Sequence, residues 1–319
     1  MDDIAKNKIL VLGALGFGSY LSKTKSNEIL ELAVENEILD LDCGIGYGNG
    51  EARKIISQFQ IASGVRFRIW EKIGLDFKAE GSVEFGYGSL KKVKFALASM
   101  LDTYRVDSIH KLQLHVPVAH TEVDFILDFL ETSMKLKEIQ NLGVSNHDEF
   151  ELIEIANQLA RRSLRLSSNQ IHYNFAERRA EQGMIESSIK LEVPLFANRV
   201  FARGLLSHKN VTQSNRMKLS KKTQIQESKY SEYYESMKKC FSDNSERDLS
   251  EIALSWVLNR KGLEGVILGV SSLSQLDSAI RAIKNPEEVS VLSRIEASIS
   301  DSELNTAKNL PSKLFDLNY

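Results

Sequence analysis

The sequence predicts one (β/α)8 barrel, a closed sheet of eight parallel strands surrounded by helices. The chain has 319 residues, a length that such a barrel can use as a single domain. Short runs rich in Ile, Leu and Val alternate with longer stretches of helical spacing, which indicates a parallel sheet. Eight strand-and-helix units follow one another without an obvious break. This regularity favours a closed barrel over an open sheet, so we assign residues 1–319 to a single domain.

The elements of the first half follow from apolar runs and a capping residue. Apolar runs predict the first three strands over 10–16, 38–42 and 67–73. Helical spacing predicts a helix over 51–59, after the second of these strands. Ser89 is a suitable N-cap and predicts a helix that reaches Tyr104.

The second half continues the alternation. Further strands are expected over 109–115, 141–145, 168–173, 194–199 and 265–270. The helices between them are expected over 121–136, 149–160 and 178–191.

A long polar insertion, residues 207–250, follows the seventh strand. Its apolar residues recur at helical steps, at Tyr230, Tyr234, Met237 and Phe241. We favour a surface helix packed on the barrel wall. The functional alternative is a mobile flap over a ligand, because long loops at this face of a barrel often carry function.

Composition and charge exclude several classes of protein. Lys and Arg number 41 against 43 for Asp and Glu, so neither nucleic acid nor an anionic membrane is expected as a partner. A hydrophobic share of 42% with 26% charged residues excludes a disordered chain. The longest apolar run, 9–18, is too short for a membrane helix of about 20 residues. Two cysteines, Cys43 and Cys240, form no disulfide framework, which favours the cytoplasm.

Two glycine clusters do not match the dinucleotide-binding fingerprint. The cluster at 13–18 has the spacing GxxGxG, and the cluster at 44–50 has Asn49 in place of the third glycine. A Rossmann-type dehydrogenase is therefore disfavoured, although a nicotinamide cofactor bound in another way stays open.

Four residues at successive strand ends suggest acid–base chemistry. Asp42, Lys72 and His115 end three strands, and Tyr47 lies in the loop after the first of them. The C-terminal ends of barrel strands meet at one mouth. An ammonium beside a phenol favours the phenolate and lowers its ordinary pKa of about 10. Tyr47 could then donate a proton to a carbonyl oxygen, with Asp42 holding the ammonium in place.

Each of these residues has a structural alternative when taken alone. A strand-end Asp is often only a cap, Lys72 could snorkel to the surface, and His115 could be a core histidine. For any one residue the structural alternative is favoured, but the order of all four at successive strand ends favours a shared catalytic site. A metal site is rejected, because His110 and His115 lie on opposite faces of a strand and no Cys or His cluster completes a ligand set.

Several segments resemble signatures of the aldo-keto reductase superfamily. Asp42 and Tyr47 keep the spacing of its Asp-Thr-Ala-x-x-Tyr-Gly signature. The other matching segments are Glu71-Lys72-Ile73-Gly74, Leu112-Gln113-Leu114-His115-Val116-Pro117, Gly143-Val144-Ser145-Asn146, Gln170-Ile171-His172-Tyr173-Asn174 and Gly269-Val270-Ser271-Ser272-Leu273-Ser274-Gln275. The resemblance covers about residues 12–283. Segments 12–18 and 199–206 are similar to a bacterial branch linked with surface-polysaccharide gene sets.

The resemblance implies a nicotinamide-dependent oxidoreductase for an aldehyde, ketone or sugar carbonyl. Tyr47 would be the proton donor, Lys72 and Asp42 its tuning pair, and His115 the residue that orients the carbonyl. The nicotinamide carboxamide would be held by Ser145, Asn146 and Gln170. The full set expected to bind the cofactor is Gly18, Ser19, Asp42, Ser145, Asn146, Gln170, Arg199, Phe201, Gly204, Gly269, Ser271, Ser272 and Gln275. Candidate substrate-pocket residues are Tyr20, Trp70 and the loop 85–87.

Two positions depart from the family pattern. Asn198 stands where many members stack an aromatic ring on the nicotinamide, and Arg281 is the first basic residue of the last loop and its helix. Family membership favours NADP(H) over NAD(H), with NAD(H) left open. The alternative function is a catalytically slow, nicotinamide-binding barrel that acts as a regulatory or sensor subunit.

Overall fold

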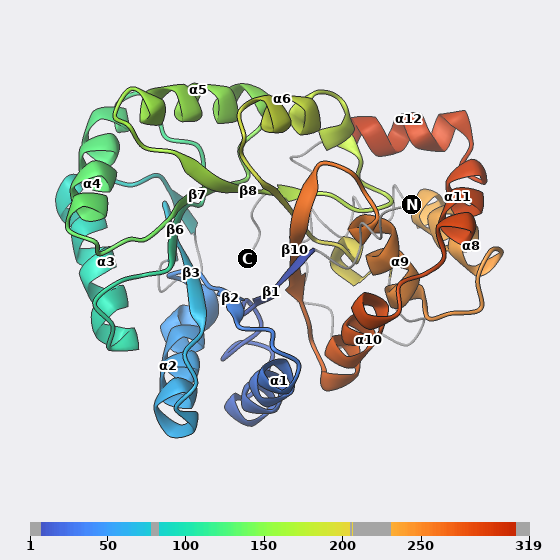
Figure 1. Cartoon of the computed structure of the whole chain (residues 1–319), viewed down its shortest axis with the longest axis horizontal. Coiled ribbons are helices and arrows are strands. Elements are labelled where there is room, and N and C mark those ends of the chain that lie inside the picture. The colour runs from blue at the N-terminus through green and yellow to red at the C-terminus, as the bar shows by residue number, and fades with distance from the viewer. Residues whose placement is uncertain (1–7, 78–82, 205, 207–230, 311–319) are drawn as a thin grey trace.

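The chain folds as the predicted closed barrel. The computed structural model describes residues 8–77, 83–204, 206 and 231–310. Its parallel strands close in the order β1-β10-β9-β8-β7-β6-β3-β2, and Figure 1 shows the strands enclosed by helices. They are β1 (Ile9–Gly13), β2 (Asp40–Asp42), β3 (Arg68–Ile73), β6 (Lys111–Leu114), β7 (Leu142–Ser145), β8 (Leu166–His172), β9 (Leu195–Asn198) and β10 (Leu263–Gly269).

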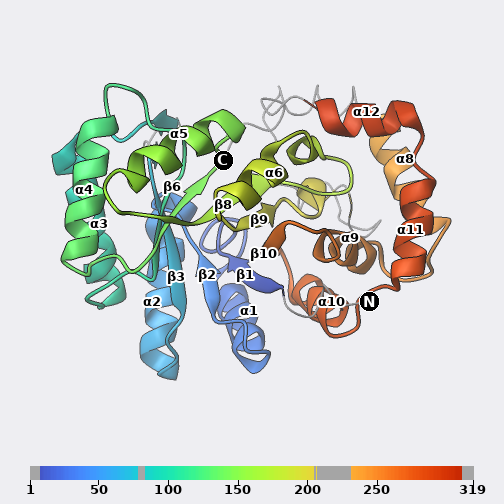
Figure 2. The same cartoon turned by 45° about the horizontal axis from the view of Figure 1, so that its top comes forward.

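Helices surround the strands. They are α1 (Lys23–Glu35), α2 (Glu51–Ser63), α3 (Leu90–Tyr104), α4 (Val123–Lys135), α5 (Glu149–Ala160), α6 (Met184–Lys190), α9 (Leu249–Leu258) and α10 (Leu273–Lys284). Ser89 caps α3 as expected, since its side chain accepts a hydrogen bond from the Lys92 backbone N–H. Figure 2 shows three more helices grouped outside this ring, α8 (Ser231–Ser242), α11 (Val289–Ala297) and α12 (Asp301–Asn309).

Two local features differ from the sequence prediction. The single helix expected over 178–191 is wrong, because a 3-10 turn η3 (Arg179–Glu181) and α6 take its place. Gly183 separates them with a φ of 125°, which ends helical geometry. The pattern also does not predict the antiparallel hairpin of β4 (Leu75–Phe77) and β5 (Val83–Phe85), which follows β3.

The insertion at 207–250 is described only in part. Residues 207–230, and Tyr230 with them, lie outside the described residues, as does most of the expected flap. The rest forms α8 and the start of α9. Tyr234, Met237 and Phe241 of α8 are buried, and α8 contacts α9. The described part of the helical stripe is therefore buried, and its helix lies against α9 of the helical ring.

The barrel interior combines a small apolar cluster with polar side chains. Val11, Trp70, Phe196 and Ile267 form a separate buried cluster inside the barrel. Two residues further along β3 and β9 come Lys72 and Asn198, which occupy the same face of each strand. Beyond this apolar cluster, the interior is therefore polar toward the mouth of the barrel.

A buried ion pair ties β3 to the helices outside it. Arg53 of α2 donates two hydrogen bonds of 2.9 Å to the carboxylate of Glu71, which is fully buried. The Tyr104 hydroxyl of α3 donates a third at 2.7 Å. Because Glu71 faces outward and Lys72 inward, this network fixes the strand that carries Lys72.

No helix in the described ranges is long and apolar enough to span a bilayer.

Candidate active site

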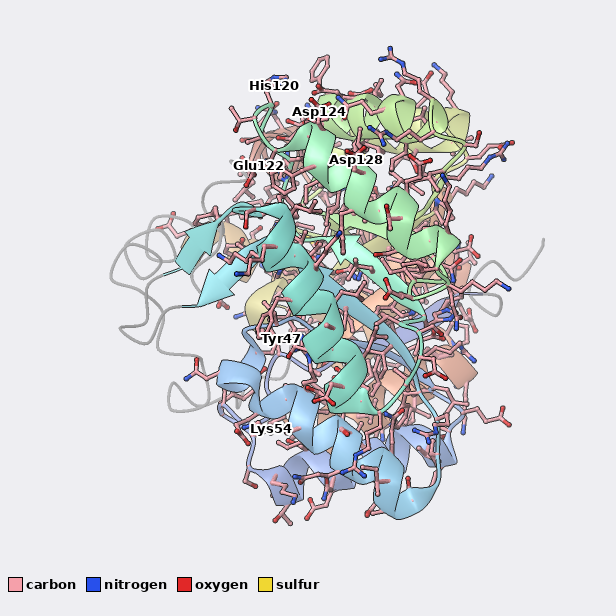
Figure 3. All side chains as sticks on the ribbon, turned by 90° about the vertical axis from the view of Figure 1, so that its left-hand side faces the viewer. Tyr47, Lys54, His120, Glu122, Asp124 and Asp128 are labelled. Atoms are coloured by element: carbon pink, nitrogen blue, oxygen red, sulfur yellow. The ribbon has the colours of Figure 1, made fainter. Side chains whose placement is uncertain are left out.

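A tight turn after β2 positions Tyr47. The turn η2 (Tyr47–Gly50) contains Gly48 and Asn49 with φ values of 57° and 53°. A Cβ on Gly48 would lie 2.4 Å from the Phe17 carbonyl oxygen, so this position requires glycine. Figure 3 shows Tyr47 beside the start of α2, with Lys54 further along that helix. The turn thus brings a buried phenol to the end of the barrel where β2 terminates.

Asp42, Tyr47 and Lys72 form one connected group. The Lys72 ammonium donates to Asp42 Oδ2 at 2.5 Å and to the Tyr47 hydroxyl at 3.2 Å. All three residues are at most 5% exposed. In such a dry setting the charge of Lys72 acts strongly on the phenol beside it. The structure therefore brings together the first three residues of the predicted set.

Asp42 accepts from glutamine side chains as well as from Lys72. Its Oδ1 accepts from Gln170 Nε2 at 2.7 Å and from Gln113 Nε2 at 3.3 Å. Sequence reasoning missed Gln113, and it predicted a different partner for Gln170. The signal for Gln113 was present, because Lys111, Gln113 and His115 alternate with leucines and share the inward face of their strand.

His115 lies next to Tyr47 and is neutral at physiological pH. The two rings meet edge to face, with their centroids 6.5 Å apart. Burial, and then the charge of Lys72, hold the pKa of His115 well below its ordinary value. Asn146 Nδ2 donates to the His115 carbonyl oxygen at 2.9 Å and to Ser145 Oγ at 3.1 Å. Ser145 and Asn146 thus lie beside the His115 strand end.

The remaining predicted cofactor residues lie in loops, or in the case of Gly269 at a strand end, at the same face of the barrel. Gly18 and Ser19 are exposed in the loop after β1. Phe201 and the turn η4 (Ala202–Gly204) follow β9, and the Arg199 carbonyl accepts from Asn174 at 3.0 Å. In the loop after β10, Gln275 Oε1 accepts from the Ser271 backbone N–H at 2.7 Å, and Ser272 caps α10. Gly269 has open space around its Cβ position.

Two of the expected pocket residues are not at the mouth. Trp70 belongs to the apolar cluster inside the barrel, and its indole N–H donates to Asp40 at 3.0 Å. Tyr87 is 1% exposed, and its hydroxyl donates to the Val116 carbonyl at 2.5 Å. Packing accounts for both residues, which corrects that part of the prediction. Tyr20 and Phe85 are exposed, so they stay candidates for the rim.

The loop that carries Tyr87 is fixed by a carboxylate at the N-cap of α4. Glu122, at the start of α4 in Figure 3, accepts from the backbone N–H groups of Tyr87 and Gly88 at 2.8 and 2.7 Å. Gly74 lies below the Tyr87 ring, because a Cβ there would meet that ring at 2.7 Å. Tyr87 is therefore fixed through both its backbone and its ring.

The histidines considered for a metal site are used in other ways. Half-buried His110 contacts Gln140 Oε1 through Nδ1 at 3.2 Å. Within the described part of the chain, no group of three or more His, Cys, Asp or Glu residues is arranged to hold a metal ion.

Known proteins share this sequence pattern. Residues 9–300 match the profile of the Aldo/keto reductase family. A relative described as the uncharacterised oxidoreductase YrpG of Bacillus subtilis (strain 168) is 26% identical over 288 residues, which cover 86% of this chain and 87% of that protein. Together with the closed barrel, these matches show an oxidoreductase of a family that uses nicotinamide cofactors and acts on small carbonyl compounds. The chain belongs to the aldo/keto reductase family.

Proposed function

We propose that this protein is an NAD(P)H-dependent reductase of aldehydes, ketones or sugar carbonyls in which Tyr47 is the general acid. The observation that carries the proposal is the buried contact of the Tyr47 hydroxyl with the Lys72 ammonium at 3.2 Å, backed by Asp42 at 2.5 Å from that ammonium. A phenol beside a fixed positive charge releases its proton more readily than a free tyrosine. This arrangement suits proton donation to an oxygen that gains negative charge.

The residues at the mouth fit a nicotinamide cofactor. Asn198 Oδ1 is a buried acceptor at the end of β9, without a hydrogen-bond partner among the described residues. An amide such as the nicotinamide carboxamide could donate to it. Gly269 leaves space beside the start of α10, and helix N-termini at this end of a barrel suit phosphate groups.

The proposed cofactor contacts remain those expected from the sequence. They are Gly18, Ser19, Asp42, Ser145, Asn146, Gln170, Arg199, Phe201, Gly204, Gly269, Ser271, Ser272 and Gln275. When bound, a reduced nicotinamide supplies the hydride, while the protein supplies position and electrostatics.

The side chains around Tyr47 have separate roles in this proposal. Tyr47 gives its proton to the carbonyl oxygen, and Lys72 stabilises the phenolate that remains. Asp42 holds Lys72 in place through their 2.5 Å contact. A neutral His115 imidazole can donate a hydrogen bond to the same carbonyl oxygen and orient it. In the reverse direction, the Tyr47 phenolate accepts the proton of an alcohol.

We propose NADP(H) over NAD(H), with Arg281 as the nearest basic residue of α10. Arg281 Nε donates to Glu251 at 2.8 Å, and the guanidinium also pairs with Asp277. A 2′-phosphate would compete with these carboxylates, so we expect only a modest preference. This preference is measured by titrating the protein with NADPH and with NADH and recording the fluorescence of the reduced nicotinamide. Tighter binding of NADH would contradict the NADP(H) proposal.

Replacing Tyr47 by Phe tests the catalytic assignment. Loss of a general acid lowers the rate by roughly 10²- to 10⁴-fold, while binding of the reduced cofactor should change little. Oxidation of NADPH or NADH, followed at 340 nm with a panel of aldehydes and keto sugars, measures the rate. Tyr233→Phe is the matched control, because the Tyr233 hydroxyl donates to the Ala176 carbonyl on the α8 side of the molecule.

Two outcomes would contradict the assignment. Full activity of the Tyr47→Phe variant would remove Tyr47 from the mechanism. Tight cofactor binding without turnover of any carbonyl would favour the alternative, a nicotinamide-binding sensor or regulatory barrel.

A further inference from the structure

A second lysine lies buried inside the barrel, below the proposed catalytic group. Lys111 of β6 is 5% exposed, and neither a hydrogen bond nor an ion pair joins its side chain to another residue in the described ranges. Its ammonium instead lies 3.4 Å from the centre of the Trp70 ring and 5.3 Å from that of Phe196. The faces of aromatic rings attract cations, so these two rings hold the charge in place.

The strand register relates Lys111 to Asp42. Asp42 pairs with Trp70 across β2 and β3, and Trp70 pairs with Lys111 across β3 and β6. The Cα atoms of Asp42 and Lys111 are therefore two strand spacings apart, roughly 10 Å. Both side chains face the interior, and Trp70 lies between the two residues in the strand register.

The charges inside the barrel do not cancel. Arg68 neutralises Asp40 with two hydrogen bonds of 3.0 and 2.5 Å, and Lys72 neutralises Asp42. Lys111 is then a third cation against two carboxylates. The charged and titratable groups on the inward faces of β2, β3 and β6 are Asp40, Asp42, Arg68, Lys72 and His115, and the charge of Lys111 also acts on His110. The neighbours from β1, β9 and β10 are the apolar Val11, Phe196 and Ile267.

We propose that Lys111 is a positioning residue for the proton transfer, because its ammonium gives the barrel interior one excess positive charge that favours the phenolate of Tyr47. This inference rests on the proposed function of Tyr47. It assigns to Lys111 an electrostatic effect that acts across the barrel interior and involves no contact with substrate or cofactor.

The effect should depend on pH. Burial lowers the pKa of Lys111 to about 8, although the charges of Asp40 and Asp42 oppose this effect. Below that pH Lys111 is protonated and assists ionisation of Tyr47, and above it the assistance is lost. The Asp42–Lys111 Cα separation of roughly 10 Å sets the scale, and unit charges that far apart in a medium of dielectric constant between about 20 and 80 shift an ionisation by roughly 0.3 to 1 pH unit.

The experiment measures ionisation of Tyr47 without cofactor or turnover. Absorbance at 295 nm is recorded up to about pH 10.5, just beyond the ordinary pKa of tyrosine. Wild type, Lys111→Met and Lys111→Arg are each compared with the same protein carrying Tyr47→Phe, so that the difference isolates Tyr47. Lys111→Met keeps the apolar length of the side chain, and Lys111→Arg keeps a charge at every pH used.

Each outcome decides the inference. Tyr47 should ionise at a higher pH in Lys111→Met than in Lys111→Arg, and wild type should follow the Arg variant below about pH 8 and the Met variant above it. Identical curves in all three proteins, or no ionisation of Tyr47 in the range, would overturn the role of Lys111. Lys94→Met, which removes an exposed lysine of α3, controls for a general change in charge.

The two proposals can fail separately. Thermal melting of each variant shows whether it is folded, and if the Met variant is not, wild type against Lys111→Arg still tests the divergence above about pH 8. A shift in Tyr47 ionisation without any carbonyl turnover would retain the role of Lys111 and reject the reductase. Turnover that depends on Tyr47, without such a shift in ionisation, would retain the reductase and reject the role of Lys111.

Discussion

Separating the structural from the chemical role of the Asp42–Lys72 pair is the sharpest test of the site. Both side chains are at most 4% exposed, and their charged atoms are 2.5 Å apart. Removing one partner of a buried pair leaves the other charge uncompensated, which costs about 3–5 kcal/mol of unfolding free energy. The loss of unfolding free energy in Lys72→Met should lie at the lower end of this range, because Gln113 and Gln170 still donate to Asp42. The loss in Asp42→Asn should be larger, since the Lys72 ammonium loses its only ion-pair partner among the described residues.

The double variant Asp42→Asn/Lys72→Met is the informative one. With both charges gone, no buried ion is left unpaired, so stability should recover to within about 2 kcal/mol of wild type. Activity should stay low in all three variants, because each lacks the ammonium or the carboxylate that holds it in place. The proposed chemistry requires both groups.

Urea unfolding at pH 7 and NADPH oxidation with one carbonyl substrate measure the two effects. For a chain of this length, 1 kcal/mol corresponds to roughly 1.5 °C in Tm, so the single variants should also melt several degrees lower. Additive stability losses would show that the pair is not coupled. Recovery of activity together with stability in the double variant would refute the catalytic role of the charges.

Two further predictions concern stability. Among the described residues, Arg53→Met leaves buried Glu71 with only the Tyr104 hydroxyl as donor, so the unfolding free energy in urea should fall by about 3–5 kcal/mol and recover partly in Arg53→Met/Glu71→Gln. An unchanged urea midpoint in Arg53→Met would refute this. Burial lowers the pKa of His147 to about 4. The unfolded chain, with a His pKa of about 6.5, then binds more protons between those values, so stability is full above pH 6.5 and falls by roughly 3 kcal/mol toward pH 4. His147→Gln should flatten this acid dependence, and parallel curves for the two proteins would contradict it.

Much of this protein was determined by local sequence pattern. The alternation of apolar runs and helical stretches predicted all eight barrel strands within a few residues, because strand and helix periods depend on neighbouring positions only. The same pattern placed Asp42, Lys72 and His115 at strand ends, and parallel strands in a closed barrel bring those ends to one face. That Tyr47 joins them depends on the glycine turn that follows β2.

Only the tertiary structure decided what each side chain contacts. Trp70 is as aromatic as a pocket residue, yet it is covered by Phe196 and Lys111 inside the barrel. Gln170 matched a cofactor-binding segment, and its amide donates to Asp42 across the interior. Contacts of this kind join residues far apart in the sequence, and they depend on strand order, register and the direction of each side chain. Periodicity along the chain does not specify which side chains of distant strands meet across the barrel interior. Closure of the barrel determines those contacts.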